Sequence, residues 1–576
     1  MEYDLVIRDG TIADGSGDYL FKGDVAVSDG IIAAVGRVDG RGREEIDATG
    51  CIVTPGFVDI HTHYDGQAHW EHTLAPSSQH GVTTVIAGNC GIGFAPCRQQ
   101  DRDTLVRFME GVEDIPEAVM EEGLPWNWES FPDYLDALAQ RELDIDIGAM
   151  VPHSPLRVFV MGQRGVDREE ATEADCAQMT RIVADAVRAG AIGVSTSRAM
   201  VHCAKDGAPA PSIGSATPEL LALAQGLKDA DNGVFQLITE ATSPPEVEFG
   251  VMLDIARRAG RPLSFTLAQS HSAPDRWRDV LRMMREANED GIRIKGQYFP
   301  RPVGTLLGLD LSFNPFSRRP SWKAIAHLSQ KEKLVHFRDT DFRERILAEE
   351  DVPDNLPLMN MVLDRRSKLF ALGNPPDYAP PASRAAGAVA AARGIDIDAL
   401  LYEWLLEQDG HAILYLPISN FADSTLDAAR AMMDDPNTVL GLGDGGAHYG
   451  LICDASFPTT MLAYWARDVA AEQRIELPRA VRMLSQEPAR TVGLDDRGEI
   501  KVGLLADLNV IDFDRLSLGR PEVRFDLPGG GRRLIQQAAG YDAIVKRGQI
   551  TYRHGVATGA LPGRLVRGGQ ARALVH

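Results

Sequence analysis

Two histidines separated by a single residue follow an apolar run near the start of the chain. His61 and His63 close the segment 57–63, which otherwise has the composition of a buried strand. Because alternate side chains of a strand point to the same side of a sheet, both imidazoles could reach one metal ion. Imidazole binds Zn²⁺ and similar borderline metals. The alternative is that two polar residues simply close a strand.

Two further side chains of ligand type follow other apolar runs. Cys90 comes after the run 83–89, and Asp444 ends the run 438–444. Metal coordination deprotonates a thiol, and a carboxylate beside a metal can act as a ligand and as a general base on water. Taken singly, Cys90 fits a buried structural cysteine and Asp444 fits a turn residue. Because three separate strands end in ligand-type residues, we predict a metal site formed by His61, His63, Cys90 and Asp444.

Eight apolar runs must position these side chains, and they alternate with amphipathic helical stretches. They are residues 57–63, 83–89, 145–152, 191–197, 234–240, 263–269, 292–298 and 438–444. Eight such units in about 430 residues predict a (β/α)8 TIM barrel, in which chemistry sits at the carboxyl ends of the strands. A ninth run, 412–419, also has the composition of a strand, so the assignment of the eight is not unique.

The two ends of the chain have a different sequence pattern from the middle. Both consist of short β-rich runs separated by Asp-Gly and related turns, which predict a small sheet. We predict a β-sandwich domain built from 1–57 and 490–576 around a barrel at 58–489. The segment 314–366 is charged and helical without a strand signal, which predicts an insertion over the barrel mouth.

Composition restricts the classes of partner. The 576 residues include 59 Lys and Arg against 82 Asp and Glu, a net charge of −23, which argues against a nucleic-acid or anionic membrane partner. No apolar run approaches the roughly 18 residues that cross a bilayer, and the acidic start does not resemble a signal peptide. Six scattered cysteines indicate reduced thiols. We therefore expect a cytoplasmic protein with a small-molecule substrate, and a homo-oligomer is possible.

Five stretches of the chain carry a family resemblance: PGFVDIHTHYD, GVTTVIAGNCGIGFAP, EGLPWNWESFPDYLDAL, AIGVSTS and GVATGALPGRLVRGG. They resemble the metal-dependent amidohydrolase superfamily, and within it the N-acyl-D-amino-acid deacylase (D-aminoacylase) group. A sixth, PARTVGLDDRGEIKVGLLADLNVID, resembles the superfamily in general. The resemblance spans most of the chain. It implies a barrel with a β-sandwich, amide hydrolysis, and metal ligands at His61, His63, Cys90 and Asp444.

The chain departs from the deacylase pattern at two strands. The group has HxRxE at the fifth strand and SHxK at the sixth, whereas this chain has Gln236 to Glu240 and Thr266 to Gln269 there. Both histidines and the lysine are absent. We therefore predict one divalent ion, most simply Zn²⁺, in place of two. Gln236 and Glu240 could be hydrogen-bonding groups of the pocket or purely structural residues.

Six residues near the predicted strand ends are candidates for catalysis or substrate binding besides the ligands. An arginine suits a substrate carboxylate, because its guanidinium donates two parallel hydrogen bonds. His153 follows the third strand and could polarise a substrate carbonyl. The candidates for substrate binding are Arg198, Arg157, His202, His448 and Arg301.

The reaction that the resemblance implies is metal-assisted hydrolysis of an amide in a small molecule such as an N-acyl-D-amino acid. Asp444 would accept the proton of the attacking water and return it to the leaving nitrogen, while His153 stabilises the oxyanion. Arg198 would hold a substrate carboxylate. Two alternatives stay open: hydrolysis of a cyclic amide or imide, as in hydantoinases, and a non-catalytic scaffold that retained the fold.

Overall fold

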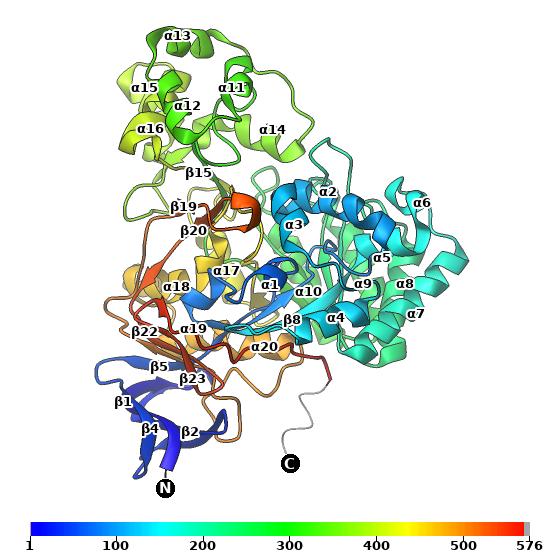
Figure 1. Cartoon of the computed structure of the whole chain (residues 1–576), viewed down its shortest axis with the longest axis vertical. Helices are drawn as coiled ribbons and strands as arrows, with labels where there is room; N and C mark the ends of the chain where they lie inside the picture. The colour runs from blue at the N-terminus through cyan, green and yellow to red at the C-terminus, as the bar shows by residue number, and fades with distance from the viewer. Residues whose placement is uncertain (1, 570–576) are drawn as a thin grey trace.

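The computed structural model describes residues 2–569, and eight parallel strands form a nearly closed barrel (Figure 1). In order around the barrel they are β6 (Phe57–Asp59), β7 (Val82–Ala87), β8 (Asp146–Pro152), β9 (Gly193–Ser197), β10 (Val234–Ile238), β11 (Leu263–Thr266), β12 (Ile294–Tyr298) and β16 (Thr438–Leu440). Each strand falls on one of the eight predicted apolar runs. The predicted TIM barrel is therefore confirmed.

Helices connect these strands, as the amphipathic stretches of the sequence predict. Four of them are α7 (Glu173–Ala189), α8 (Thr217–Ala230), α9 (Pro245–Ala259) and α10 (Arg276–Glu289). The start of α7 is fixed by a capping box between Thr172 and Asp175, and its end is capped by Gly190, whose φ of 114° favours glycine. Among residues 2–569, no helix combines the length and the apolar composition that crossing a membrane requires.

The ninth apolar run lies outside the barrel. It forms β15 (Leu414–Ser419), which pairs antiparallel with β13 (Val303–Leu307) and β14 (Phe370–Ala371). Barrel strands and strands of this small sheet are equally apolar, because both are buried on both faces. Apolar content alone therefore does not distinguish them.

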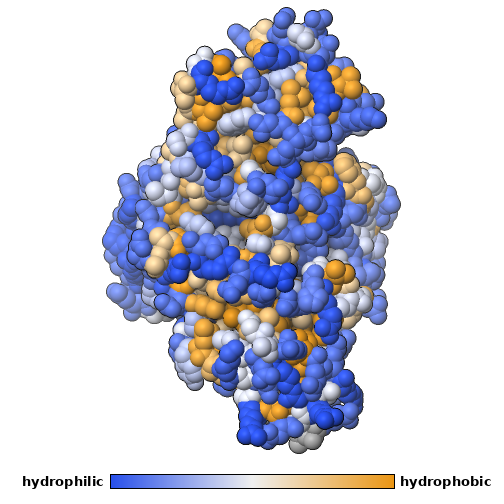
Figure 2. All heavy atoms as spheres, turned by 90° about the vertical axis from the view of Figure 1, so that its left-hand side faces the viewer, coloured by the Kyte–Doolittle hydropathy of each residue, from blue (hydrophilic) through white to orange (hydrophobic). Residues whose placement is uncertain are grey.

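A helical lobe is inserted between β12 and β16, and we use this name for residues 316–410. The predicted insertion at 314–366 contains α11 (Pro320–Ile325), α12 (Gln330–Phe337), α13 (Thr340–Ala348) and α14 (Pro357–Leu363); α15 (Ala386–Arg393) and α16 (Ile397–Gly410) follow. The lobe has its own core, in which Phe316, Phe337 and Tyr402 pack together. It forms the top of the molecule, and a notch sets it off from the body (Figures 1 and 2).

Strands from both ends of the chain lie side by side in one nine-stranded sheet at the foot of the molecule (Figure 1). The strands are β1 (Glu2–Ala13), β2 (Leu20–Ser28), β3 (Ile31–Gly36), β4 (Arg41–Asp47), β5 (Ile52–Pro55), β17 (Leu508–Ile511), β22 (Tyr541–Lys546), β23 (Gln549–Arg553) and β24 (Val556–Ala557). Strand β17 pairs antiparallel with β5 and so joins the two ends. The domain boundaries at 57 and 490 stay a prediction.

A buried ion cluster connects this sheet to the barrel. Asp146, the first residue of β8, lies 2.8 Å from both Lys546 Nζ at the end of β22 and the guanidinium of Arg497. Burial raises the pKa of the Asp146 carboxyl, but the cations outweigh it and hold that pKa below its ordinary value. The barrel floor and the terminal sheet thus share one charge network.

Candidate metal centre

The segment after β6 continues the barrel wall beyond the strand itself. On one side, His63 N donates to Gly445 O at 2.8 Å and Asp444 N donates to His61 O at 3.0 Å; on the other, Thr62 N donates to Ile86 O at 3.1 Å. This alternation of partners is that of a strand between two neighbours, so His61 and His63 face the same side. Both histidines are buried.

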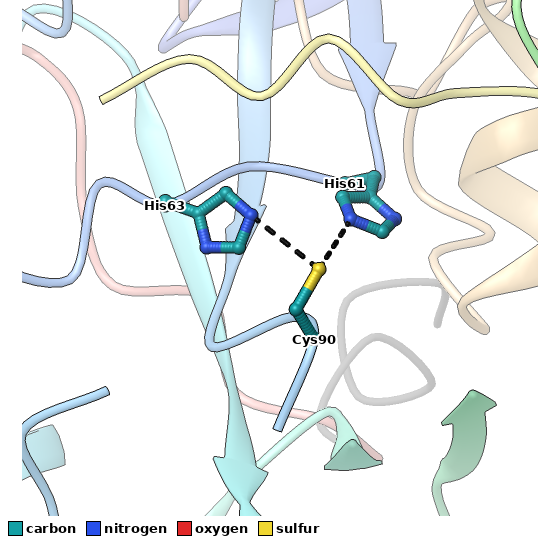
Figure 3. Close-up of side chains that lie close together, drawn as sticks. All are labelled: His61, His63 and Cys90. Atoms are coloured by element: carbon teal, nitrogen blue, oxygen red, sulfur yellow. Dashed lines mark hydrogen bonds between the residues drawn. The ribbon is translucent and has the colours of Figure 1, made fainter. Parts of the chain in front are cut away.

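Cys90 follows β7 and directs its thiol between the two imidazoles (Figure 3). Its Sγ lies 3.2 Å from His61 Nε2 and 3.7 Å from His63 Nε2. Asp444 approaches the same two nitrogens, with its Oδ1 3.4 Å from His61 Nε2 and 3.5 Å from His63 Nε2. The four predicted ligand residues therefore converge.

These separations fit a single tetrahedral ion. Zinc bonds of about 2.0–2.1 Å to nitrogen and about 2.3 Å to sulfur place ligand atoms roughly 3.3–3.6 Å apart. The thiol, two imidazoles and carboxylate described above lie 3.2 to 3.7 Å apart where they approach one another. Within residues 2–569, His61, His63 and Cys90 form the one group of three or more ligand-type side chains whose ligand atoms all lie within 4.8 Å of one another.

The charges of the site favour a cation. Burial raises the pKa of Asp444, but a hydrogen bond from His63 and the charges of His61 and His63 outweigh it, so the pKa lies well below its ordinary value and the carboxylate is ionised. Burial raises the pKa of the Cys90 thiol to about 12. A bound cation would reverse that shift, because coordination stabilises the thiolate.

Glycines around Asp444 allow it to approach the two histidines closely. A Cβ on Gly443 would lie 2.0 Å from Asp59 Oδ2, and one on Gly445 would lie 2.6 Å from both Ser77 Oγ and Tyr64 OH. Asp444 itself has a φ of 47°, a left-handed conformation that aspartate tolerates better than most residues. The Gly-Asp-Gly-Gly sequence thus has a packing reason.

Glu113, which the sequence analysis did not single out, supports two of the site histidines. It ends α2 (Arg102–Glu113) and is buried, with one oxygen 3.4 Å from His63 Nδ1 and the other 3.4 Å from His448 Nε2. Burial raises its pKa to about 7. A carboxylate on the outer nitrogen of a ligand imidazole fixes the ring so that its other nitrogen faces the metal.

Two glutamines of the barrel wall hold other ligand residues. Gln297 on β12 places Oε1 2.7 Å from His61 Nδ1, and its Nε2 donates to Ser264 Oγ at 3.0 Å. Gln236 on β10 accepts a 3.2 Å hydrogen bond from Cys90 N. Gln297 is not among the residues predicted from the sequence, although its place at the end of the seventh strand run was a usable signal. Glu240 lies farther out, where it accepts from Met200 N and Thr242.

His153 and Arg157 lie together behind the barrel wall on α5 (His153–Met161). The ring of His153 is 2.8 Å from Thr196 Oγ1 on one side and 2.8 Å from Glu219 Oε1 on the other. Arg157 Nε donates to the same Glu219 oxygen at 2.8 Å. Both side chains are fully engaged within the protein, and their roles toward a substrate stay predictions.

The other two predicted substrate arginines also have protein partners. Arg198 forms a bidentate pair with Glu248, at 2.9 and 3.0 Å. Arg301 is buried and donates to Asp454 at 3.0 Å and to Cys453 O at 2.8 Å. The sequence places these acidic partners 50 and 153 positions away, so local reading could not pair them.

A cavity of about 750 Å³ opens at the candidate metal centre, and we call it the metal-side chamber. Asp444, His448 and His202 line it, together with residues of the helical lobe and of the hairpin before β20 (Arg533–Ile535). The Asp444 side chain is 20% exposed, so it is accessible from the chamber. Burial lowers the pKa values of His202 and His448 to about 4, so both rings are neutral near pH 7. The structure thus brings Asp444, His202 and His448 to one cavity.

The family follows from the sequence match. The amidohydrolase family model matches residues 44–307 and 334–552. The chain belongs to this family, and it is a hydrolase of carbon–nitrogen bonds other than peptide bonds. The family resemblance predicted from the sequence motifs is confirmed.

Three individual proteins show how similar this chain is to known sequences and structures. An uncharacterized protein of Mycobacterium tuberculosis is 27% identical, over 99% of this chain and 97% of its own length. The D-aminoacylase of Alcaligenes xylosoxydans xylosoxydans is 35% identical over 34% of this chain and 37% of its own length. A solved N-acyl-D-glutamate deacylase from Bordetella bronchiseptica, complexed with zinc and a phosphonate inhibitor, has a TM-score of 0.66 at 20% identity, covering 98% of this chain and 100% of its own. It shares the fold.

Proposed function

We propose that this protein hydrolyses the amide bond of a small N-acylated molecule of the N-acyl-D-amino-acid type. One observation carries the proposal: His61, His63 and Cys90 form a compact group of ligand-type side chains, and Asp444 lies within 3.5 Å of both histidines beside a chamber large enough for such a molecule. The D-aminoacylase of Alcaligenes xylosoxydans xylosoxydans supports the same substrate class. The free state of all six cysteines is in keeping with a cytoplasmic location.

One divalent ion, zinc in our proposal, would be held by His61, His63, Cys90 and Asp444. Such an ion supplies Lewis acidity that activates water and polarises a carbonyl group. The positions at the ends of β10 and β11 favour one ion over two, because Gln236 binds the Cys90 backbone and Leu267, which replaces the second histidine, has no ligand atom. Four protein ligands complete a tetrahedron, so water access requires Cys90 or Asp444 to loosen its contact.

Asp444 is the general base in this proposal. Its carboxylate is ionised, it is accessible from the chamber, and it lies against both ligand histidines. It accepts the proton of the attacking water and passes it to the leaving nitrogen. His153 stays a candidate for oxyanion stabilisation, although its present hydrogen bonds to Thr196 and Glu219 would have to change.

The test is hydrolysis of N-acetyl-D-amino acids by zinc-supplied protein, with the L-enantiomers and a hydantoin measured in parallel. Asp444→Asn should lower kcat by at least roughly 10²–10⁴-fold, because it removes the base and weakens a metal ligand as well. Asp495→Asn, at an exposed loop position, is the matched control and should keep wild-type rates. Turnover of the hydantoin alone would replace the proposal with cyclic-amide hydrolysis. Failure to bind metal or to turn over any amide would favour the scaffold alternative.

A further inference from the structure

A second chamber adjoins the metal-side chamber and has a volume of about 610 Å³. Three residues line both spaces: Val201, His202 and Ile418. The second chamber lies over the carboxyl ends of β10 and β11, where Ile238 and Thr266 line it. It therefore shares the barrel rim that carries the candidate metal ligands.

The walls of the second chamber are mainly apolar. Six large apolar side chains line it: Met252, Phe265, Leu267, Trp277, Val280 and Met361. Met361 belongs to α14 of the helical lobe, so the lobe closes the chamber from above the barrel. Such a surface favours an aliphatic or aromatic group, because burial of apolar area is the main source of its affinity.

Three buried polar atoms on this surface lack a hydrogen-bond partner within residues 2–569. They are Thr266 Oγ1, His271 Nε2 and His202 Nδ1. A buried polar group without a partner is costly, and it is a common sign of a ligand or water that completes its bonding. His202 lies where the two chambers meet, so a molecule that spans both would pass it.

One charged residue that lines the chamber, Arg365, has no carboxylate partner within residues 2–569. Arg365 lines the chamber, and within residues 2–569 its side chain has a single hydrogen bond, to Pro417 O at 3.4 Å. Its neighbour Arg366 instead pairs with Asp351 at 2.7 Å. The other cations near the chamber are occupied: Arg198 pairs with Glu248, and Arg276 binds the backbone oxygens of Glu240 and Ala241.

We propose that the second chamber binds an extended apolar arm of the substrate and that Arg365 is the counter-ion of a carboxylate at the end of that arm. The inference rests on the proposed function for the identity of the other end, which lies at the candidate metal centre. It predicts a substrate bulkier than an N-acetylated small amino acid. An arginine that lacks a protein carboxylate retains its charge for a ligand.

Binding of product-like acids tests the inference without turnover. Octanedioate and octanoate share one chain length and differ in the second carboxylate, and calorimetry on zinc-supplied protein measures the affinity for each. We expect wild type to bind octanedioate about tenfold more tightly, which is the contribution of one charge-assisted hydrogen-bond pair. Arg365→Met should remove that ratio. Lys368→Met, the same charge change at a nearby exposed residue outside the chamber, should preserve it.

A substitution that fills part of the second chamber tests whether the apolar arm of the substrate binds there. Ala268 lines the chamber after β11, and Ala268→Phe should weaken both acids, with folding and bound zinc verified by melting temperature and elemental analysis. An unchanged octanedioate preference in Arg365→Met would overturn the proposal, as would unchanged affinities in Ala268→Phe or absent binding to wild type. If the protein hydrolyses N-acyl-D-amino acids but does not bind octanedioate more tightly than octanoate, this inference alone is refuted. If it prefers octanedioate but hydrolyses no amide, the proposed function alone is refuted.

Discussion

At the scale of single residues, the candidate metal centre depends on groups that hold the ligands as well as on the ligands themselves. Glu113 is buried between His63 and His448, and Gln297 holds the outer nitrogen of His61. The hydrogen bond to Gln297 fixes the orientation of the His61 ring before any ion binds, and the Glu113 carboxylate lies 3.4 Å from His63 Nδ1, where it favours the orientation of that ring. A preoriented ring binds metal more tightly, because less freedom is lost on coordination.

Glu113→Gln should lower zinc affinity by about 10–100-fold, which is the usual effect of removing such a support. The amide keeps the size of the side chain but loses the charge that stabilises a metal-bound imidazole. Competition with a fluorescent zinc chelator measures the change. Glu117→Gln, at an exposed residue of α3 (Glu117–Gly123), is the control. Equal zinc affinities in the two variants would show that Glu113 does not support the site.

The sequence allowed the ligand residues to be predicted but not their supports. His61, His63, Cys90 and Asp444 each follow an apolar run, and parallel strands bring such positions to one rim. Glu113 is the last residue of α2, which lies in the connection between β7 and β8. No motif in the neighbouring sequence identifies it as part of a site. The acidic partners of Arg157, Arg198 and Arg301 come from distant elements, so these ion pairs could not be predicted from the local sequence.

At the scale of elements, the loop after β16 is shaped by close contact with the segment after β6. Two backbone hydrogen bonds join the segments, and Gly445 leaves no room for a Cβ against Ser77 and Tyr64. The position of Asp444 is therefore set by packing around it. The glycines are needed for space as well as for flexibility.

Gly445→Ala should displace Asp444 and reduce both bound zinc and activity, with a stability loss of about 1–3 kcal/mol from overpacking. Gly250→Ala on α9 is the control. No atom lies within 4 Å of a Cβ at Gly250, so that variant should be neutral or slightly stabilised. Melting temperature and zinc content measured together give the comparison. Normal zinc binding by Gly445→Ala would mean that the loop adapts without moving the carboxylate.

The apolar pattern of the sequence locates the strands but does not show which of them belong to the barrel. The eight barrel strands match eight apolar runs because strands buried on both faces are continuously apolar. The run that forms β15 has the same composition, and only its antiparallel pairing with β13 sets it apart. The helices α15 and α16 join the core of the helical lobe through contacts far apart in sequence.

At the scale of the whole molecule, Asp146 connects the barrel to the terminal sheet. Asp146→Asn would leave Lys546 and Arg497 less well compensated and should destabilise the protein by about 3 kcal/mol. The native pKa of Asp146 is depressed, so its contribution is present above the unfolded value near 4 and is lost as the pH falls below about 4. The melting-temperature gap between wild type and variant should therefore narrow in acid.

Asp495→Asn serves as the control for that series and should match wild type at every pH. A gap that stays constant from pH 7 down to about pH 3 would contradict the linkage argument. A gap absent at pH 7 would show that the cluster adds no net stability. In that case the desolvation of Asp146 cancels its attraction to the cations.

The count of metal ions per chain tests the central claim most directly. Elemental analysis of zinc-supplied protein should find about one ion per chain. The zinc content should be lower in both Cys90→Ser and Asp444→Asn. Two ions would mean that ligands other than His61, His63, Cys90 and Asp444 complete a second site. No bound ion, even with excess zinc and in the folded wild-type protein, would contradict the metal-dependent hydrolase.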